Sequence, residues 1–298
     1  MRDILTTYRN GNYKVVLLKD GTKIRYNNED TLRAFFAESI DCTITTVCDG
    51  GCRYCYLNCN PNGKHADLNQ PFFDTLHRGQ ELALNGNDLS HPHLVEFLQR
   101  MKRQGVICNL TVNQKHFMQH VDFLRMLAKD ELIYGLGISL VDSSDRDFYE
   151  YIKAFPNAVI HTIDGLLTEQ DIKNMSDRNI KLLILGYKIL GRGDKYYWAH
   201  QKDIEDNVRW LGENIMSIKD KFAVVSFDNL AIEHLDLKSK VDSRVWDYSY
   251  MGDEGSATFY IDAVNKKFSV SSTDSRQFDL MDSVDDMFQI LPILTEDE

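Results

Sequence analysis

The sequence lacks the features that mark membrane, exported and nucleic-acid-binding proteins. It contains no apolar run of membrane-spanning length, and residues 1–5 include an acid where a signal peptide needs a long apolar core. Lys and Arg total 34 against 45 Asp and Glu, which gives a net charge of −11. Because nucleic-acid affinity depends on clustered cations, we expect a cytoplasmic protein that binds neither membrane nor nucleic acid.

Proline is scarce, and runs of serine or glycine are missing. Only 5 prolines occur in 298 residues, roughly a third of average usage, so flexible linkers and disordered tails are not expected. Hydrophobic residues make up 43% and charged residues 27% of the chain, which is typical of globular proteins. A chain of this length can bury a substantial core in one large domain or two ordinary ones.

Cysteine is too rare for a disulfide scaffold, with 6 residues in the whole chain. Cys42 and Cys108 stand alone in apolar stretches, and we interpret them as buried core residues. The other four fall within residues 48–59. In a reducing compartment, clustered cysteines more often bind metal or perform redox chemistry than form disulfides. These four are Cys48, Cys52, Cys55 and Cys59.

The pattern of apolar residues predicts an α/β fold. A hairpin is expected over 12–26, around Asp20-Gly21, followed by a short helix over 29–38. Strands then alternate with helices, which predicts βαβ units around a parallel sheet, with enough repeats for a partial or full barrel. Strands are expected at 40–47, 81–84, 106–112, 134–141, 158–163, 180–188 and 222–227, and helices at 94–104, 121–129, 146–155, 169–177 and 203–218.

The pattern changes after about residue 230. Two β-rich runs, 257–264 and 267–272, predict a second hairpin, and 284–291 predicts a closing helix. We therefore expect three parts. Their boundaries are 1–38 for an N-terminal hairpin and short helix, 39–230 for the barrel core, and 231–298 for a C-terminal extension. The two hairpins are expected to cover part of the barrel opening.

The most informative segment follows the first strand of the alternating region. It reads Cys48-Asp49-Gly50-Gly51-Cys52-Arg53-Tyr54-Cys55-Tyr56. Three thiolates with a glycine pair between them suit a compact metal centre, and a cubane held by three cysteines keeps one iron open for a ligand.

Two other metal centres remain open for this segment. With Cys59 the four cysteines could hold tetrahedral zinc, although zinc modules usually separate their ligand pairs by roughly a dozen residues or more. A four-cysteine electron-transfer cluster is the second alternative. Such runs normally end in Cys-Pro, whereas here Asn60 follows Cys59.

The segment resembles the CxxxCxxC signature of the radical SAM superfamily, with Tyr54 as the aromatic residue before the third cysteine. The resemblance covers about residues 38 to 230. It implies a partial (β/α)6 TIM-like barrel and one 4Fe–4S cluster on Cys48, Cys52 and Cys55. It also implies S-adenosylmethionine as cofactor, reductive cleavage to a 5′-deoxyadenosyl radical, and a flavodoxin- or ferredoxin-type electron donor.

The resemblance extends to the end of the second strand. Residues 84–93 resemble the family's GGEP segment, which implies cofactor contacts at Gly86, Asn87 and Asp88. Asn87 stands where the family has a glutamate, so an uncharged amide replaces a carboxylate there. An Asx-rich turn is the alternative interpretation. Four later strand ends resemble further cofactor contacts of the family. They are Asn113, Ser139, Ile163 and Leu185.

Five polar residues near the expected barrel mouth are candidate substrate contacts. They are Lys64, His65, Lys188, Arg192 and Asp228. His116 and His120 are interpreted as exposed helix polarity and not as ligands. No second cysteine cluster exists for an auxiliary cubane. The expected activity is a radical SAM reaction of unknown subclass, oxidoreductase or transferase, on a small molecule or nucleoside. A peptide or protein substrate is the runner-up, and a non-catalytic zinc or iron–sulfur sensor is the alternative class.

Overall fold

The computed structural model describes residues 3–29 and 31–295. Its main feature is a ten-stranded sheet with the order β10-β9-β8-β7-β6-β5-β4-β11-β12-β13. The strands from β10 to β11 are parallel, which confirms an α/β fold with a large parallel sheet. These strands are β4 (Ser39–Thr43), β5 (Glu81–Asn85), β6 (Ile107–Asn113), β7 (Leu136–Ser139), β8 (Ala158–Ile163), β9 (Lys181–Leu185), β10 (Val224–Phe227) and β11 (Thr258–Asp262).

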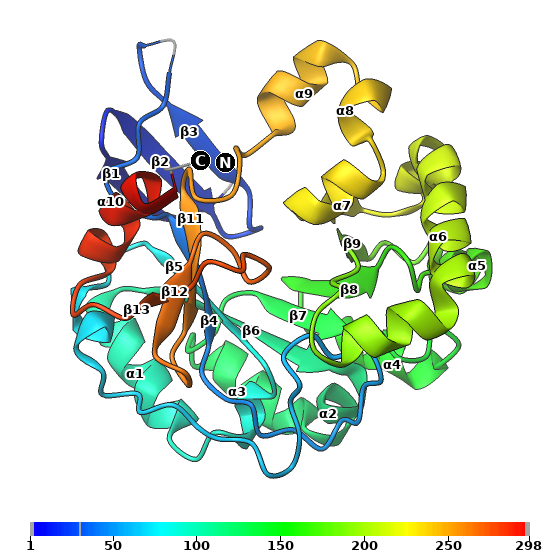
Figure 1. Ribbon diagram of the computed structural model, residues 1–298, viewed down its shortest axis with the longest axis horizontal. Coiled ribbons are helices and arrows are strands. Elements are labelled where there is room, and N and C mark those ends of the chain that lie inside the picture. Colours follow the sequence, from blue (N-terminus) through cyan, green and yellow to red (C-terminus); the bar gives the residue numbers. More distant parts are fainter. Residues whose placement is uncertain (1–2, 30, 296–298) are drawn as a thin grey trace.

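Helices connect consecutive strands and cover one face of the sheet (Figure 1). From β4 to β10 each strand pairs with the next one along the chain, and right-handed crossovers then place every helix on the same side. The sheet has free edges at β10 and β13 within the described residues, so it forms no closed barrel there. The helices are α1 (Leu94–Gln104), α2 (Gln114–Gln119), α3 (Val121–Lys129), α4 (Arg146–Ile152), α5 (Glu169–Met175) and α6 (Arg192–Ile218), with 3-10 turns η1 (Pro71–Thr75), η2 (Asp88–Ser90) and η3 (Lys219–Lys221).

Burial alternates along the central strands. In β6, Cys108, Leu110 and Val112 are buried, whereas the residues between them are half-buried. Because successive side chains point to opposite faces of a strand, one set packs under the helices and the other faces the opposite side. The same alternation occurs in β5, β8 and β9. The face opposite the helices is therefore free to form the wall of a cavity.

The N-terminal part is a three-stranded antiparallel sheet of β1 (Ile4–Asn10), β2 (Tyr13–Leu18) and β3 (Lys23–Tyr26). The hairpin expected over 12–26 is confirmed as β2–β3. Its turn closes the amino-terminal end of the large sheet. The turn's carbonyl oxygens accept hydrogen bonds from Tyr134 Oη (3.2 Å), Asn157 Nδ2 (3.0 Å) and Lys181 Nζ (3.1 Å).

The helix expected over 29–38 is wrong for the described residues of that segment, which exclude residue 30. Side chains in and beside the N-terminal sheet instead accept hydrogen bonds from the backbone N–H groups of this segment. Asn10 Oδ1 accepts hydrogen bonds from the N–H groups of Phe35 (2.8 Å) and Phe36 (3.1 Å), and Asn12 Oδ1 accepts one from Arg33 (2.8 Å). These long-range partners replace the local bonds of a helix.

The C-terminal part returns to the large sheet. After α7 (Asn229–His234), α8 (Leu237–Lys240) and α9 (Ser243–Ser249), strand β11 pairs in parallel with β4. The expected second hairpin is present as β11 and β12 (Lys267–Ser269), but it extends the sheet and does not pair with the N-terminal hairpin. β13 (Phe278–Asp279) and α10 (Val284–Thr295) follow.

Most expected elements of the alternating region are confirmed within a few residues. The largest difference is α6, which begins at Arg192 and not at residue 203, with a kink at His200 (φ −132°, ψ 21°). The short helix α2 was not expected. In the described part of the chain, no helix combines the length and the apolar character needed to cross a bilayer.

Candidate active site

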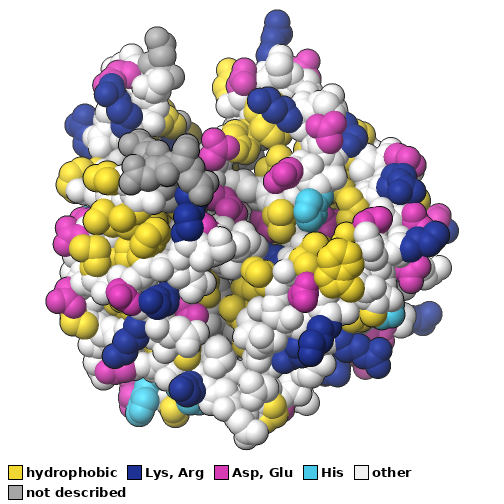
Figure 2. All heavy atoms as spheres, in the orientation of Figure 1, with side chains coloured by type: hydrophobic (Ala, Val, Ile, Leu, Met, Phe, Trp, Pro, Cys, Tyr) yellow, Lys and Arg dark blue, Asp and Glu magenta, His cyan; other side chains and the backbone are white. Residues whose placement is uncertain are grey.

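A cavity of about 1090 Å3 lies on the face of the sheet opposite the helices. The half-buried residues of β5 to β10 form its wall, and the turn of the β2–β3 hairpin lines its amino-terminal end. Figure 2 shows a hollow on this face, between the part formed by β1–β3 and α10 and the part formed by α6–α9. The segment from residue 48 to residue 59, here called the cysteine loop, lines the other end. Active sites of related α/β architectures lie at such carboxyl ends of strands.

Cys48, Cys52 and Cys55 are half-buried and all line this cavity. A methyl group on Gly50 would lie 3.3 Å from Cys48 Sγ and 3.9 Å from Cys52 Sγ, so the glycine leaves room for both sulfurs. The Gly50 N–H donates a hydrogen bond to Cys48 Sγ (3.3 Å), and Asn113 Nδ2 donates one to Cys52 Sγ (3.6 Å). Such donors stabilise thiolates.

The six cysteines differ in their surroundings. Burial raises the pKa of the Cys48 and Cys52 thiols, whereas a hydrogen bond from Cys59 lowers the pKa of Cys55 to about 6. The same bond raises the pKa of Cys59, which is buried. Cys59 is therefore the neighbour that favours the thiolate form of Cys55. Residues Cys42 and Cys108 are buried, as the sequence predicted.

Arg192 holds the cysteine loop from the start of α6. Its Nε donates to the Cys52 carbonyl oxygen (2.9 Å), and its backbone N–H donates to the Cys55 carbonyl oxygen (3.0 Å). The preceding Gly191 has φ +57°, and a methyl group on it would lie 2.4 Å from the Tyr56 carbonyl oxygen. Arg192 does not line the cavity, so its expected contact with an anionic ligand stays a prediction.

The donor set of the cysteine loop suits an iron–sulfur cluster. Soft thiolates are the preferred ligands of such clusters, and hydrogen bonds to the sulfurs accompany them. A second group of possible ligands overlaps with this set, because the ligand atoms of Cys48, Asp49 and His116 lie within 4.8 Å of one another. His116 is buried and its Nε2 lies 2.7 Å from Asp49 Oδ1, so the expectation of an exposed histidine was wrong.

The segment that resembles GGEP divides into two parts. Gly86 lines the cavity with φ +109°, and a methyl group on it would lie 2.6 Å from the Thr45 carbonyl oxygen. Asn87 and Asp88 are buried outside the cavity lining. None of the described residues donates a hydrogen bond to either oxygen of the Asp88 carboxyl group, and burial raises the pKa of Asp88 to about 8.

The other expected cofactor contacts come together in space. Asn113 serves two ends, because its Oδ1 also caps α2 by accepting a hydrogen bond from the Lys115 N–H (2.9 Å). Asn113 therefore both lines the cavity and caps a helix. The residues of this group that line the cavity are Tyr54, Asn113, Ser139, Ile163 and Leu185. Their role toward a cofactor stays a prediction.

The candidate substrate residues are split between two places. Lys64 and His65 are exposed and do not line the cavity. Lys188 lines it, donating from Nζ to Ser272 Oγ (2.7 Å) with the Tyr56 ring 4.4 Å away. Asp228 also lines it and caps α7, accepting from Ala231 N–H (2.8 Å) and Gly186 N–H (2.9 Å). Burial raises the pKa of Asp228.

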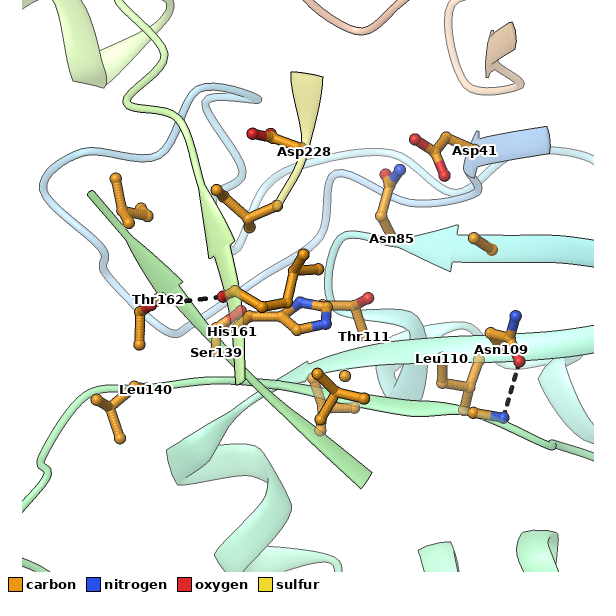
Figure 3. A pocket seen from close by; sticks show the side chains of 18 of the residues that line it. Asp41, Asn85, Asn109, Leu110, Thr111, Ser139, Leu140, His161, Thr162 and Asp228 are labelled. Atoms are coloured by element: carbon orange, nitrogen blue, oxygen red, sulfur yellow. Dashed lines mark hydrogen bonds between the residues drawn. The ribbon is translucent and has the colours of Figure 1, made fainter. Parts of the chain in front are cut away.

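Several residues that line the cavity were not predicted from the sequence. Asp41 is an acid within the apolar strand β4, and that single break in the pattern was the only local signal. Burial lowers the pKa of His161 to about 4, which keeps its ring neutral. The ring packs on Gly137, where a methyl group would lie 2.2 Å from His161 Cε1. Figure 3 shows Asp41, Asn85 and Asp228 along one side of the cavity, with His161 and Thr111 beside them.

No model of a protein family matches the sequence, and neither does any curated protein. Two solved structures are similar in fold. Streptococcus suis SuiB bound to S-adenosylmethionine has a TM-score of 0.58 at 10% identity, covering 100% of this chain and 88% of that one. Native anSMEcpe with bound AdoMet and Cp18Cys peptide has a TM-score of 0.54 at 9% identity, covering 87% of this chain and 81% of that one. At these identities the likeness shows a shared fold.

Proposed function

We propose that this protein is a radical SAM enzyme in which Cys48, Cys52 and Cys55 hold one 4Fe–4S cluster. The observation that carries the proposal is the placement of these three cysteines at a large cavity, at the carboxyl end of a parallel sheet. The two similar structures contain S-adenosylmethionine, which supports the same cofactor here. The open, one-sided sheet supports a partial (β/α)6 barrel.

When bound and reduced by an external electron donor, the cluster would supply the electron for cleavage of S-adenosylmethionine to methionine and a 5′-deoxyadenosyl radical, the species that would abstract hydrogen from the substrate. The chain's own residues hold and shield this centre. Gly50 and Asn113 donate to the ligand sulfurs, and Arg192 fixes the loop backbone. Gly86 and Ser139 line the cavity where the cofactor is expected to lie.

A small molecule or nucleoside is the first candidate for the substrate. A peptide is the second, because the similar anSMEcpe structure contains the Cp18Cys peptide. We further propose a flavodoxin- or ferredoxin-type electron donor and a cytoplasmic location. The three parts 1–38, 39–230 and 231–298 stay a proposal for the domain organisation.

The proposal is tested by Cys48→Ala, with Cys108→Ala as control because Cys108 is buried in β6 away from the loop. Anaerobically reconstituted protein is reduced with dithionite in the presence of S-adenosylmethionine, and 5′-deoxyadenosine is quantified. The Cys48 variant is expected to form none, and the control to form it at the wild-type rate. Product from the Cys48 variant would contradict the assignment.

Iron, sulfide and zinc analysis separates an iron–sulfur centre from the zinc-binding alternative. We expect about four irons per chain and a brown protein, whereas one colourless zinc would favour a zinc-binding sensor. Cys59→Ala separates the two sites further. Because Cys59 acts on Cys55 as a neighbour and is not one of the three proposed ligands, we expect this variant to retain its iron. Loss of all metal in Cys59→Ala would indicate a four-cysteine centre instead.

A further inference from the structure

Acidic side chains gather around Lys188 in the cavity. Asp41 from β4, Asp228 after β10 and Glu254 from the segment before β11 all line it. These elements lie far apart in the sequence, and the fold brings them to one cavity. Asp and Glu side chains also border the upper part of the hollow in Figure 2. Three carboxyl groups therefore share this end of the cavity with one ammonium group.

Lys188 cannot balance all three carboxyl groups. Its ammonium group is held by Ser272 Oγ and the face of the Tyr56 ring. Asp228 uses Oδ1 for the backbone N–H groups of Gly186 and Ala231, whereas none of the described residues donates a hydrogen bond to its Oδ2. The Asp41 carboxyl group likewise has no hydrogen-bond donor among the described residues, and it points into the cavity beside Asn85 (Figure 3).

The electrostatics of these groups favour a positively charged ligand. Asp41 is exposed to the cavity, and the protein around it raises the pKa of its carboxyl group. Lys188 lowers this pKa, whereas the charges of Glu254 and Asp228 raise it further. Carboxylates that raise one another's pKa repel each other, and a cation that enters between them reduces this repulsion. Inside a cavity with low-dielectric walls, such a contact is stronger than on an open surface. A neutral or anionic group would leave the Asp41 carboxyl group and Oδ2 of Asp228 without a partner there.

We propose that the substrate carries a protonated amine or guanidinium group, which Asp41 and Asp228 bind within the cavity while Glu254 adds negative charge beside them. This inference rests on the proposed function, because it assigns the cavity's substrate class. The cation can belong to a small amine or to a lysine or arginine side chain of a peptide. Both sources present the same chemistry to the carboxyl groups.

Calorimetric titration of the unreduced holoenzyme, saturated with S-adenosylmethionine, tests this without turnover. The small probe is 1,5-diaminopentane, with 1,5-pentanediol as its neutral isostere. The peptide probe is Ala-Lys-Ala with blocked termini, with its acetyl-lysine form as isostere. We expect at least one cationic probe to bind on the order of tenfold or more tightly than its isostere. Whichever probe binds identifies the source of the cation.

Four variants assign the binding to this site. Asp41→Asn is expected to weaken binding of the cationic probe by about tenfold to a hundredfold. Glu254→Gln is expected to weaken this binding less. Lys188→Met is expected to strengthen binding of the probe, because a competing cation is removed from the cavity. Asp282→Asn is the control, since Asp282 is exposed, does not line the cavity and carries the same charge. It should leave the affinity unchanged.

Several results would overturn the inference. One is equal binding of each cation and its isostere. Others are unchanged affinity in Asp41→Asn, or weaker binding in Lys188→Met, which would indicate an anionic ligand. Loss of S-adenosylmethionine affinity in Asp41→Asn, with probe binding intact, would assign Asp41 to the cofactor. Failure to form 5′-deoxyadenosine while the cation still binds would overturn the proposed function and leave this site standing.

Discussion

Burial sets the protonation state of single side chains around the cavity. His161 is kept neutral by its lowered pKa, and Asp88 is kept protonated at moderate pH because burial raises its pKa to about 8. Cys55 differs, because the hydrogen bond from Cys59 favours its thiolate. Desolvation therefore suppresses the charged forms of His161 and Asp88, whereas a hydrogen bond promotes the charged form of Cys55.

Asp88→Asn is expected to stabilise the protein increasingly as pH rises. The carboxyl group has a pKa near 4 when unfolded and about 8 when folded, so the native state binds an extra proton between these values. Stability that Asp88 provides below about pH 4 is lost as pH approaches 8, by up to about 1.4 kcal/mol per pH unit. Asparagine does not titrate and avoids this loss.

Urea unfolding between pH 5 and 9 measures the effect. The difference between variant and wild type should grow with pH and level off above about pH 8. Asp282→Asn, at an exposed site, should show no such trend. A difference that is flat with pH would mean that the Asp88 carboxyl group ionises in the native state much as it does in water.

At the scale of elements, buried ionic contacts fasten the N-terminal sheet to the large one. The Glu38 side chain is fully buried and lies 2.8 Å from Arg25 Nε and 3.2 Å from Lys23 Nζ. Tyr13 Oη donates to it as well (2.5 Å). Lys23 also reaches Glu81 of β5 at 2.6 Å. This network holds β3 at the amino-terminal end of the cavity, where the hairpin turn closes it.

Arg25→Met is expected to destabilise the fold by about 3–5 kcal/mol, because it leaves the buried Glu38 charge undercompensated. Lys19→Met is the control. Lys19 forms an exposed ion pair with Asp3 at 3.4 Å, and such pairs contribute less than about 1 kcal/mol. Denaturant unfolding of the two variants measures the contrast. Similar small losses in both would show that Glu38 is solvated or protonated in the native state.

The elements also show where local sequence is sufficient. The boundaries of α1 and α3 match the expectation, because their apolar residues repeat with helical spacing and bury one face. The segment 29–38 carries no such constraint from within. Its backbone N–H groups donate hydrogen bonds to the side chains of Asn10 and Asn12, which lie in and beside a strand distant in the sequence. Local propensity therefore predicts a helix that does not form there.

At the scale of the whole molecule, the C-terminal part completes the sheet. β11 pairs with β4 over five residue pairs, from Thr258–Ser39 to Asp262–Thr43. α10 packs near η1, where the Val284 N–H donates to Thr75 Oγ1 (3.0 Å). Without these contacts the edge of β4 and part of the core would be exposed to water.

A chain that ends at residue 230 is therefore expected not to fold cooperatively. Its far-ultraviolet circular dichroism should show no sharp thermal or urea transition, unlike the full chain. A full chain nicked by protease within residues 241–256 is the control, because it keeps β11 and α10. A cooperative transition of the truncated chain would instead support an independent core.

The sequence alone determined the properties that depend on neighbouring residues. Cysteine spacing within residues 48–55 indicated a metal site, and the periodicity of apolar residues indicated the α/β class. The tertiary structure decided which distant groups meet. It brings Asn113 to Cys52 across 61 residues, His116 to Asp49 across 67, and Asp41, Asp228 and Glu254 into one cavity. Such contacts follow from the order of the strands in the sheet, in which β11 lies beside β4, and neighbouring residues in the sequence do not specify that order.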